Sequence, residues 1–321
     1  METVLVTGGA GYIGSILVRK LLQKGYKVRV LDKFLFGIES LKEISANPNL
    51  KIIVGDIRNI NDVKPAVTGV DHIVHLAAIV GDPACAVQAD AAVETNLIST
   101  IRLAQLSKNI PGKFIFASTC SVYGKTDGEA TEDSPTNPLS LYAETKLKSE
   151  KALLQMYDTK ELSPVILRFS TIHGLSPRMR FDLVVNFFVK KALMDGKITV
   201  FGGEQWRPFI HVADVAEALL MSIEADKDLV IGEIFNVGDK TENYTIKQVA
   251  DIVSKNTGAN VEIIKDMKDA RDYKVNFDKI SRILNFHRNT DVQNSVKEMI
   301  GAIKSKKITN PNDPKYYNYH P

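Results

Sequence analysis

The sequence has few cysteines and no long apolar run. Its 321 residues include two cysteines, Cys85 and Cys120, which is too few for a disulfide framework or a paired metal motif. No uninterrupted apolar stretch is long enough to span a bilayer, and the N-terminus does not show the basic segment and apolar core of a signal peptide. We therefore expect a soluble, cytoplasmic protein.

Neither sign of charge is in large excess. The chain has 41 Lys and Arg against 38 Asp and Glu, a formal net charge of +3, and the most basic run, KSKK at 304–307, is typical of a solvated helix end. His72 and His75 are three positions apart in a predicted strand, so they face opposite sides. We expect no metal site and neither nucleic acid nor membrane as a partner.

Glycine, in contrast, is concentrated near the start. Residues 4–15 read VLVTGGAGYIGS, in which Gly8, Gly11 and Gly14 are spaced G-x-x-G-x-x-G between an apolar run and a helical apolar pattern. A strand, a glycine turn and a helix start point backbone N–H groups and a helix N-terminus at a phosphate. The triplet alone is also compatible with a purely structural turn.

The next strand supplies a second signal. The run KVRVLD ends at Asp32, eighteen positions after Gly14. A carboxylate at this place accepts hydrogen bonds from adenosine ribose hydroxyls, and its charge disfavours a 2′-phosphate. Lys33, the next residue, weakens that discrimination. The pattern predicts NAD as the cofactor.

Strand-like and helical stretches alternate through the first half of the chain. Strands are predicted at 51–56, 71–77, 113–118 and 164–170, and the clearest helices at 87–109 and 141–158. Short apolar strands separated by helices indicate a parallel sheet covered on both faces. We therefore predict an α/β fold, a Rossmann-type doubly wound parallel sheet with a smaller C-terminal α/β substrate domain.

The second half is less regular, with a helix predicted at 180–196 and a strand at 197–203. We assign the NAD-binding domain to residues 1–171 and 204–241, and the substrate domain to 172–203 and 242–321. The tail from residue 310 shows no periodicity. Its tyrosines, Tyr316, Tyr317 and Tyr319, indicate a tail that either packs onto the body or stays disordered.

A tyrosine and a lysine stand four residues apart in the segment YAETK. This spacing places Tyr142 and Lys146 on one helix face, where the ammonium can lower the pKa of the phenol. An exposed helix face would show the same pair. The run FASTCSVYG favours chemistry, because it brings Thr119 and Ser121 to a strand end where a hydroxyl can hold a substrate oxygen.

Several ordered motifs together resemble the extended short-chain dehydrogenase/reductase family, and within it the NAD-dependent nucleotide-sugar epimerases and dehydratases. The matching segments are TGGAGYIGS, GDIR at 55–58, HLAA at 75–78, YAETK, and RPFIHVADVA at 207–216. The resemblance runs through most of the chain. It implies that the glycine turn carries the pyrophosphate of NAD.

The resemblance also implies roles for single residues. Tyr142 would take the proton of a sugar hydroxyl, commonly at C4, while Lys146 holds the nicotinamide ribose and Thr119 bonds the reacting oxygen. The 4-keto sugar could then be reduced on its other face, lose water, or be released or taken in as a substrate. The implied cofactor-binding residues are Gly8, Gly11, Tyr12, Ile13, Gly14, Asp32, Asp56, Ile57, Leu76, Ala77, Ala78, Asn96, Ser118, Tyr142 and Lys146.

The sugar side departs from the family pattern at two places. The 4,6-dehydratases carry Asp-Glu after the threonine, whereas this chain has Cys120 and Ser121, so a standard 4,6-elimination is not expected. Thr171 stands where many members have asparagine. We predict an epimerase or oxidoreductase acting through a 4-keto sugar, with a C4 dehydrogenase or 4-ketoreductase as the alternative. A non-catalytic NAD-binding regulator is disfavoured because Thr119, Tyr142 and Lys146 are all present.

A nucleotide-diphosphate sugar requires cations, and arginine suits phosphate. The residues that resemble substrate contacts in the family are Cys120, Ser121, Thr171, Asn186, Arg207 and Arg271. Arg178 and Arg180 are as compatible with surface charges as with ligands, and Cys85 either packs in the core or borders the sugar. The resemblance further implies a homodimer, with a seam on the helices 87–109 and 141–158 formed by residues such as Leu97, Ile101, Leu147 and Leu154.

Overall fold

A parallel sheet of seven strands forms the centre of the computed structural model, which describes residues 1–265 and 269–318. The strand order is β3-β2-β1-β4-β5-β7-β11. This order reverses between β1 and β4, as in a doubly wound fold, and confirms the predicted Rossmann-type class. The strands are β1 (Thr3–Thr7), β2 (Lys27–Asp32), β3 (Leu50–Val54), β4 (His72–His75), β5 (Phe114–Thr119), β7 (Pro164–Phe169) and β11 (Ile234–Val237).

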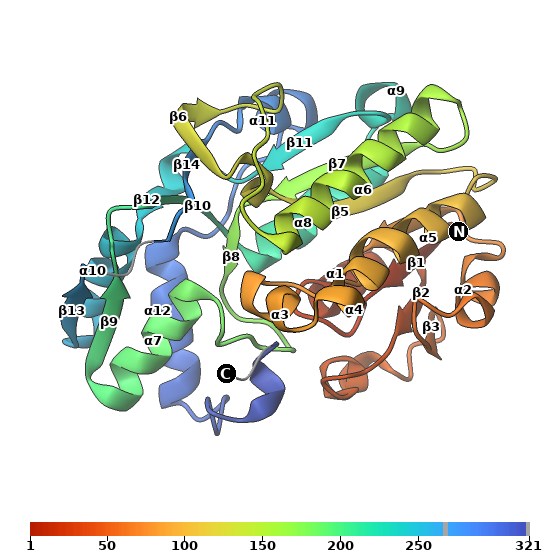
Figure 1. Cartoon of the computed structure of the whole chain (residues 1–321). Coiled ribbons are helices and arrows are strands. Elements are labelled where there is room, and N and C mark those ends of the chain that lie inside the picture. The colour runs from red at the N-terminus through yellow and green to blue at the C-terminus, as the bar shows by residue number, and fades with distance from the viewer. Residues whose placement is uncertain (266–268, 319–321) are drawn as a thin grey trace.

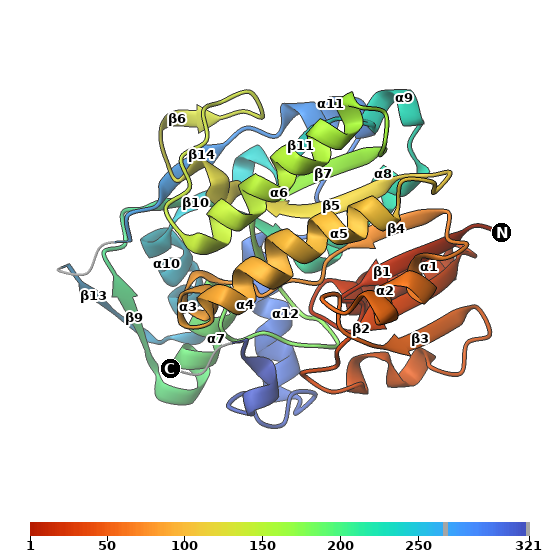
Figure 2. The same ribbon diagram turned by 45° about the vertical axis from the view of Figure 1, so that its right-hand side comes forward.

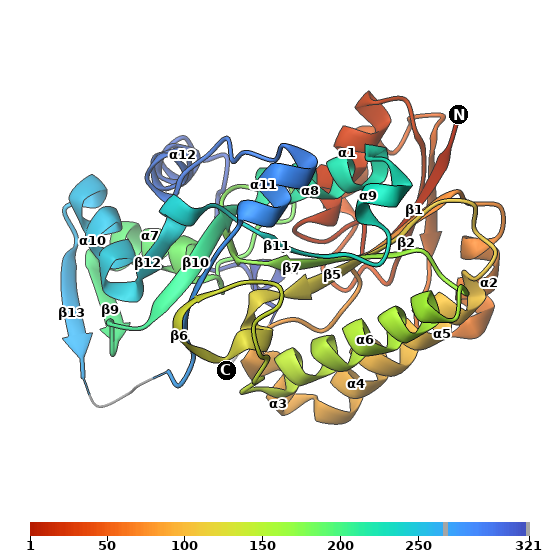
Figure 3. The ribbon, with the colours of Figure 1, turned by 90° about the horizontal axis from the view of Figure 1, so that it is seen from above.

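Helices cover both faces of this sheet (Figures 1 and 3). On one face lie α1 (Gly14–Gln23) and α8 (Val212–Glu224), where Leu17 and Leu219 share a buried cluster with Val6. On the other lie α2 (Ile60–Val67), α5 (Ser99–Leu106) and α6 (Leu141–Asp158), where Leu103 and Leu153 pack in a cluster with Phe116. Burial on both faces explains why the strands read as continuous apolar runs.

A smaller lobe packs around a second apolar cluster that includes Phe181, Phe188, Phe209 and Met299. Its short sheets join β8 (Thr171–His173), β10 (Trp206–His211) and β12 (Asn243–Thr245), and separately β9 (Lys197–Phe201) and β13 (Asn260–Ile264). The helices of this lobe are α7 (Val184–Asp195), α10 (Ile246–Thr257) and α12 (Val292–Lys304).

The remaining elements are a two-stranded sheet, two short helices and several helical turns. They are β6 (Lys125–Ala130), β14 (Asp272–Val275), α9 (Lys227–Val230), α11 (Asp278–Leu284) and the short helical turns η1 (Glu39–Ile44), η3 (Cys120–Tyr123), η4 (Lys240–Glu242) and η5 (Pro314–Tyr316). β10, from the segment assigned to the NAD-binding domain, pairs within the small sheet, whereas Tyr273 and Ile280 join the large core. The domain boundaries therefore stay a prediction.

The helix predicted at 87–109 is not continuous. α3 (Asp82–Val87) ends where the predicted helix begins, and the segment holds α4 (Ala89–Val93), a π-helical turn η2 (Glu94–Ile98) and α5. The chain kinks at Gln88, with φ −118° and ψ 50°. In the π turn the Ser99 hydroxyl donates to the Glu94 carbonyl at 2.8 Å. Such turns are frequent at functional sites, and this one aims Asn96 at the loop after β4.

Two other predicted elements are shorter than their apolar patterns. β7 ends at Phe169, and the chain then leaves the large sheet to form β8 in the small one. The helix predicted at 180–196 starts at Val184, because Arg180 pairs with Asp182 in the preceding loop. Among the described residues, no helix has both the length and the apolar character needed to cross a membrane. No group of three or more His, Cys, Asp or Glu side chains in the same residues could hold a metal ion.

Candidate active site

A cavity of about 530 Å³ opens at the carboxyl ends of the parallel strands, the place where doubly wound sheets bind ligands. Most of the predicted site residues line it. These are Gly8, Gly11, Tyr12, Ile13, Gly14, Asp32, Asp56, Ile57, Leu76, Ala77, Ala78, Ser118, Thr119, Ser121, Tyr142, Lys146, Thr171 and Arg271. The lining described for the cavity does not include Asn96, Cys120, Asn186 or Arg207.

The glycine turn between β1 and α1 forms one wall. Gly8 has φ +72°, and a Cβ there would lie 2.8 Å from the Ala77 backbone nitrogen. A Cβ on Gly14 would lie 2.3 Å from the Gly8 carbonyl oxygen. Any side chain at these two positions would push the turn away from β4 and from the start of α1. Glycine therefore allows the backbone N–H groups to face the cavity closely enough to contact a phosphate.

Two carboxylates mark the far end of this wall. Asp32 accepts hydrogen bonds from the backbone N–H groups of Ala10, at 2.9 Å, and Phe34, at 2.8 Å. Burial raises the pKa of Asp32. The ammonium of Lys33 pairs with Asp56 at 3.1 Å. Because Lys33 is engaged by Asp56, its charge is directed away from Asp32, and the preference of Asp32 for unphosphorylated ribose is not offset.

The three predicted catalytic residues meet at the end of β5. Ser140 caps α6 by accepting from the Ala143 N–H at 3.2 Å, which sets the helix bearing Tyr142 and Lys146. The Lys146 ammonium donates to the Ala117 carbonyl at 2.8 Å. The Thr119 hydroxyl accepts from the Ser121 N–H at 3.1 Å, which leaves its proton for another acceptor.

Burial controls the protonation of this group. It lowers the pKa of Lys146 to about 8 and raises the pKa of Tyr142 above its ordinary value. Cys85 and Asp82 also raise the pKa of Tyr142, whereas the charge of Arg180 lowers it. The expected acidification of Tyr142 by Lys146 is thus not the leading effect among the protein groups, because the buried ammonium is itself destabilised.

A buried ion pair links α6 to β7 behind the end of β5. Arg168 and Glu150 pair at 2.7 Å, with side chains that are 4 % and 1 % exposed. The Ser118 hydroxyl donates to the Glu150 carboxylate, so the side chain of this predicted cofactor residue is turned toward the protein. Removing one partner of such a pair leaves an uncompensated buried charge.

Three predicted ligands lie behind the cavity wall. The Asn96 amide donates to the Ile79 carbonyl at 2.9 Å and accepts from its N–H at 2.8 Å, which orients the loop after β4. Asn186 bonds Gly174 and the Tyr12 hydroxyl. The fully buried thiol of Cys120 donates to a main-chain carbonyl. The polar atoms of all three side chains are hydrogen-bonded to the main chain. We therefore expect each of them to hold the segments that line the cavity in place.

The two arginines predicted to bind a diphosphate converge on one carboxylate. Arg207 pairs with Asp269 at 2.9 Å and Arg271 pairs with it at 2.5 Å. Arg271 also pairs with Asp82 at the start of α3. Arg207 is buried and lies 5.0 Å from the Tyr273 ring centre, while Arg271 reaches the cavity. Two guanidinium groups around one anion form a ready site for a second anion of similar geometry.

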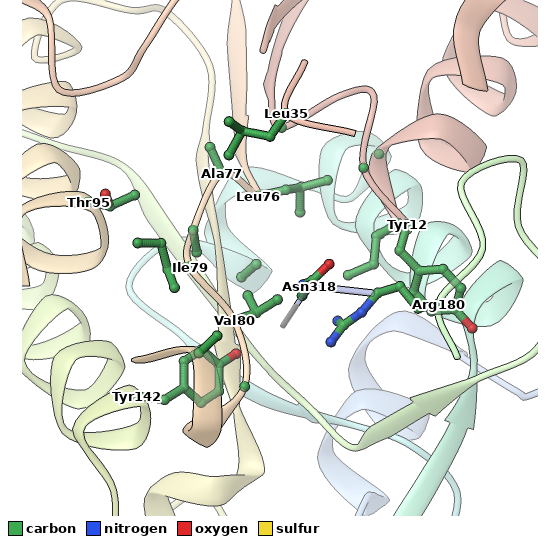
Figure 4. Close-up of a pocket in the computed structure, with 18 of the residues that line it drawn as sticks. Tyr12, Leu35, Leu76, Ala77, Ile79, Val80, Thr95, Tyr142, Arg180 and Asn318 are labelled. Atoms are coloured by element: carbon green, nitrogen blue, oxygen red, sulfur yellow. The ribbon is translucent and has the colours of Figure 1, made fainter. Parts of the chain in front are cut away.

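Two positively charged side chains in the loop between β8 and α7 also face the cavity. Arg178 and Arg180, which the sequence left undecided, both line it. In Figure 4, Tyr142 and Val80 lie on one side of the cavity and Tyr12 and Arg180 on the other. Asn318 lines the same cavity, and sequence reasoning missed it because the tail carries neither periodicity nor a motif.

Comparison with protein families matches residues 4–238 to the NAD dependent epimerase/dehydratase family. The chain belongs to this family. It is 30% identical to UDP-N-acetyl-alpha-D-glucosaminuronate decarboxylase of Bacillus cytotoxicus, over 92% of this chain and 96% of that protein. It is 28% identical to dTDP-glucose 4,6-dehydratase of an Actinoplanes species, over 95% and 98%.

The fold matches solved members of the same group. The structure of UDP-glucuronic acid 4-epimerase from Bacillus cereus, in complex with UDP-glucuronic acid and NAD, superposes with a TM-score of 0.86. The two chains are 30% identical, and the match covers 94% of this chain and 99% of that one. The protein is therefore an NAD-dependent enzyme of the nucleotide-sugar epimerase, decarboxylase and dehydratase group.

The residues present fit NAD. The glycine turn has the space for a pyrophosphate that any side chain there would occupy. The Asp32 carboxylate lies at the end of the cavity where the adenosine ribose would bind. Lys146 stands within reach of the other end of the cavity, on the same helix face as Tyr142. When bound, NAD supplies the acceptor and donor of a hydride. The chain itself supplies a base, a hydrogen-bond donor and cations.

Proposed function

We propose that this protein is an NAD-dependent nucleotide-sugar 4-epimerase that acts through a transient 4-keto sugar. The observation that carries the proposal is the grouping of Thr119, Tyr142 and Lys146 around one cavity with the glycine turn. A second observation is the thiol and hydroxyl of Cys120 and Ser121, where an elimination would use carboxylic acids. Hydride removal and return require only the first grouping.

The side chains have distinct parts in this reaction. The Tyr142 oxygen takes the proton of the sugar 4-hydroxyl as the C4 hydride leaves, and gives it back on reduction. The Thr119 hydroxyl donates to the same sugar oxygen and keeps it aligned. Lys146 holds the nicotinamide ribose. Burial raises the pKa of Tyr142, which works against the phenolate that the first step needs and favours the phenol that returns the proton in the second.

For the substrate we propose a nucleoside-diphosphate hexuronate. The lining cations Arg180 and Arg271 can pair with a diphosphate and a sugar carboxylate. The named substrates of relatives support this class, since UDP-glucuronic acid is bound in the Bacillus cereus epimerase and in MoeE5. Several curated relatives are named as decarboxylases of nucleotide-linked uronic acids, among them the plant UDP-glucuronic acid decarboxylase 1.

Decarboxylation is the second candidate, because the 4-keto form of a hexuronate is a β-keto acid. Loss of CO2 would leave an enolate that is protonated at C5 and then reduced at C4 to a pentose. A cation paired with the carboxylate stabilises that charge and opposes the formation of neutral CO2. Arg180 lines the cavity and pairs with Asp182, so it would take this role by exchanging Asp182 for the sugar carboxylate, and would then favour epimerisation.

The test is incubation of the purified enzyme with UDP-glucuronic acid, UDP-glucose and dTDP-glucose, with products followed by NMR in deuterated water. Epimerisation is expected to give the C4 epimer without added NAD and without deuterium at C5. Release of CO2 with deuterium at C5 would establish the decarboxylase, and loss of water with C5 exchange would establish a dehydratase. A requirement for stoichiometric oxidant or reductant would establish the dehydrogenase or ketoreductase alternative.

We also propose a homodimer built on α5 and α6. Figure 2 shows these helices side by side on one face of the molecule. Ile101 and Leu154 on these helices and Leu97 in the preceding turn η2 are partly exposed, whereas Leu147 is buried in the core of its own chain. The seam therefore consists of the first three residues without Leu147. Light scattering at micromolar concentration checks the state, and a monomer would overturn the proposal.

A further inference from the structure

The C-terminal tail returns to the cofactor cavity. Asn318 lines that cavity together with residues of the glycine turn. Figure 4 shows its side chain in the middle of the view, between Tyr12 and Arg180 on one side and Val80 on the other. In Figure 1 the chain turns at the lower end of α12, and the tail lies close beside that end of the helix.

Hydrogen bonds and ring contacts attach the tail to the small lobe. The Phe181 N–H donates to the Tyr316 carbonyl at 2.9 Å, and their rings meet edge to face at 5.8 Å. The Lys190 ammonium donates to the Tyr317 hydroxyl at 2.5 Å. Both tyrosines pack against the small-lobe core. The tail is thereby docked on α7 and on the loop before it.

Asn318 is hydrogen-bonded to the buried guanidinium of Arg178. Its amide oxygen accepts from the Arg178 guanidinium at 2.6 Å. Arg178 is 5 % exposed and lies 3.8 Å from the Phe36 ring centre. The Nε atom of Arg178 has no hydrogen-bond partner among the described residues. Loss of Asn318 would leave this buried guanidinium with less compensation.

The tail also leans on the segment that follows Asp32. A second hollow of about 540 Å³ is bounded by Leu35, Phe36 and Gly37 on one side and by Lys315, Tyr317 and Asn318 on the other. Residues 314–318 therefore reach from α7 to the adenosine side of the cavity. Of these residues, Asn318 is the one that lines the cofactor cavity.

We propose that residues 314–318 form a strap over the NAD site, and that Asn318 is a positioning residue that slows release of the cofactor. The inference rests on the proposed function in one respect. An epimerase that returns the hydride to the same sugar has to keep its NAD through the cycle, and a strap gives that retention.

The test is the rate of NADH release, measured by stopped-flow fluorescence in the absence of any sugar. Asn318→Ala removes the partner of Arg178, and Tyr316→Ala removes the contact with Phe181. Each should release NADH about threefold to tenfold faster, the effect of one lost hydrogen bond or ring contact. Asn312→Ala, at an exposed tail position, is the matched control and should release NADH at the wild-type rate.

Thermal unfolding of the NAD-free proteins separates retention from folding, because Asn318→Ala should still unfold cooperatively, with a Tm lowered only by the loss of one hydrogen bond to Arg178. An unchanged release rate in Asn318→Ala would overturn the strap. Slower release would also overturn it, because it would show that the tail competes with the cofactor. Since no sugar is present, faster release in a protein that fails to epimerise would reject the proposed function and leave the strap standing.

Discussion

The two ends of the pocket hold their charged groups in different ways. At the cofactor end, the Asp32 carboxylate is bonded to main-chain N–H groups of neighbouring turns. At the sugar end, the Arg271 guanidinium is bonded to the side chains of Asp82 and Asp269. The first arrangement belongs to the backbone of the fold. The second consists of ion pairs about one third exposed, with side-chain exposures of 31 % and 32 % for Arg271 and Asp269.

This difference teaches how each end meets its ligand. Main-chain partners stay with Asp32 when ribose binds, so the carboxylate is already oriented and little rearrangement is needed. If the substrate diphosphate binds at Arg271, as we predict, it has to exchange with a carboxylate that already neutralises the guanidinium. Partly exposed pairs are weak enough for such an exchange. The cofactor end is thus preorganised, and the sugar end trades one anion for another.

The largest effect is expected where the two ends meet. Tyr142→Phe removes the group that accepts the hydroxyl proton, and kcat should fall by about two to four orders of magnitude. NAD affinity should change little, because the glycine turn and Asp32 remain. Thr119→Val should cost less, since a single hydrogen bond to the reacting oxygen is lost. Steady-state kinetics with parallel NADH titrations checks this, and full activity of Tyr142→Phe would exclude the phenol as the base.

Arginine substitutions test the sugar end directly. Arg271→Ala or Arg207→Ala should raise the substrate KM by about tenfold to a hundredfold, the usual contribution of a charged hydrogen bond. NAD affinity should stay the same, and Arg282→Ala, at an exposed position on α11, is the control. Unfolded variants would point to a structural ion pair with Asp269, so circular dichroism accompanies the kinetics.

Asp32 provides the opposite test at the cofactor end. The wild-type enzyme should bind NADH at least about tenfold more tightly than NADPH, a gap of about 1.4 kcal/mol. Asp32→Ala should narrow that gap, because the repulsion of a 2′-phosphate is removed, while the sugar KM stays unchanged. Fluorescence titration measures both cofactors. Equal affinities in the wild type would show that Lys33 compensates despite its pair with Asp56.

The smallest effect concerns the anion that is exchanged. Asp269→Asn keeps the shape of the side chain and removes its charge, so a diphosphate no longer displaces a carboxylate from Arg207 and Arg271. The substrate KM should fall by about twofold to fivefold, less than a full ion pair is worth because the pair is partly solvated. A higher KM would mean that Asp269 aims the arginines and does not compete with the substrate.

Much of the fold and of the cofactor end could be predicted from the sequence. The glycine turn, Asp32 and the pair Tyr142 and Lys146 lie within short segments whose spacing is set by local strand and helix geometry. The helix at 87–109 could not be predicted correctly, since its kink and π turn depend on the contact of Asn96 with the loop after β4. Apolar periodicity does not carry that information.

The sequence by itself determined the chemistry at the strand ends, because a parallel sheet brings consecutive strand termini to one edge whatever the rest of the chain does. Only the tertiary structure decided which polar groups face the cavity and which serve as its walls. Asn186 and Cys120 are claimed by main-chain and side-chain partners behind the wall, while Arg178 and Asn318 are brought into it from 140 positions apart. Such contacts depend on how the small lobe and the tail pack against the sheet. A local pattern of residues does not specify contacts between positions so far apart in the sequence.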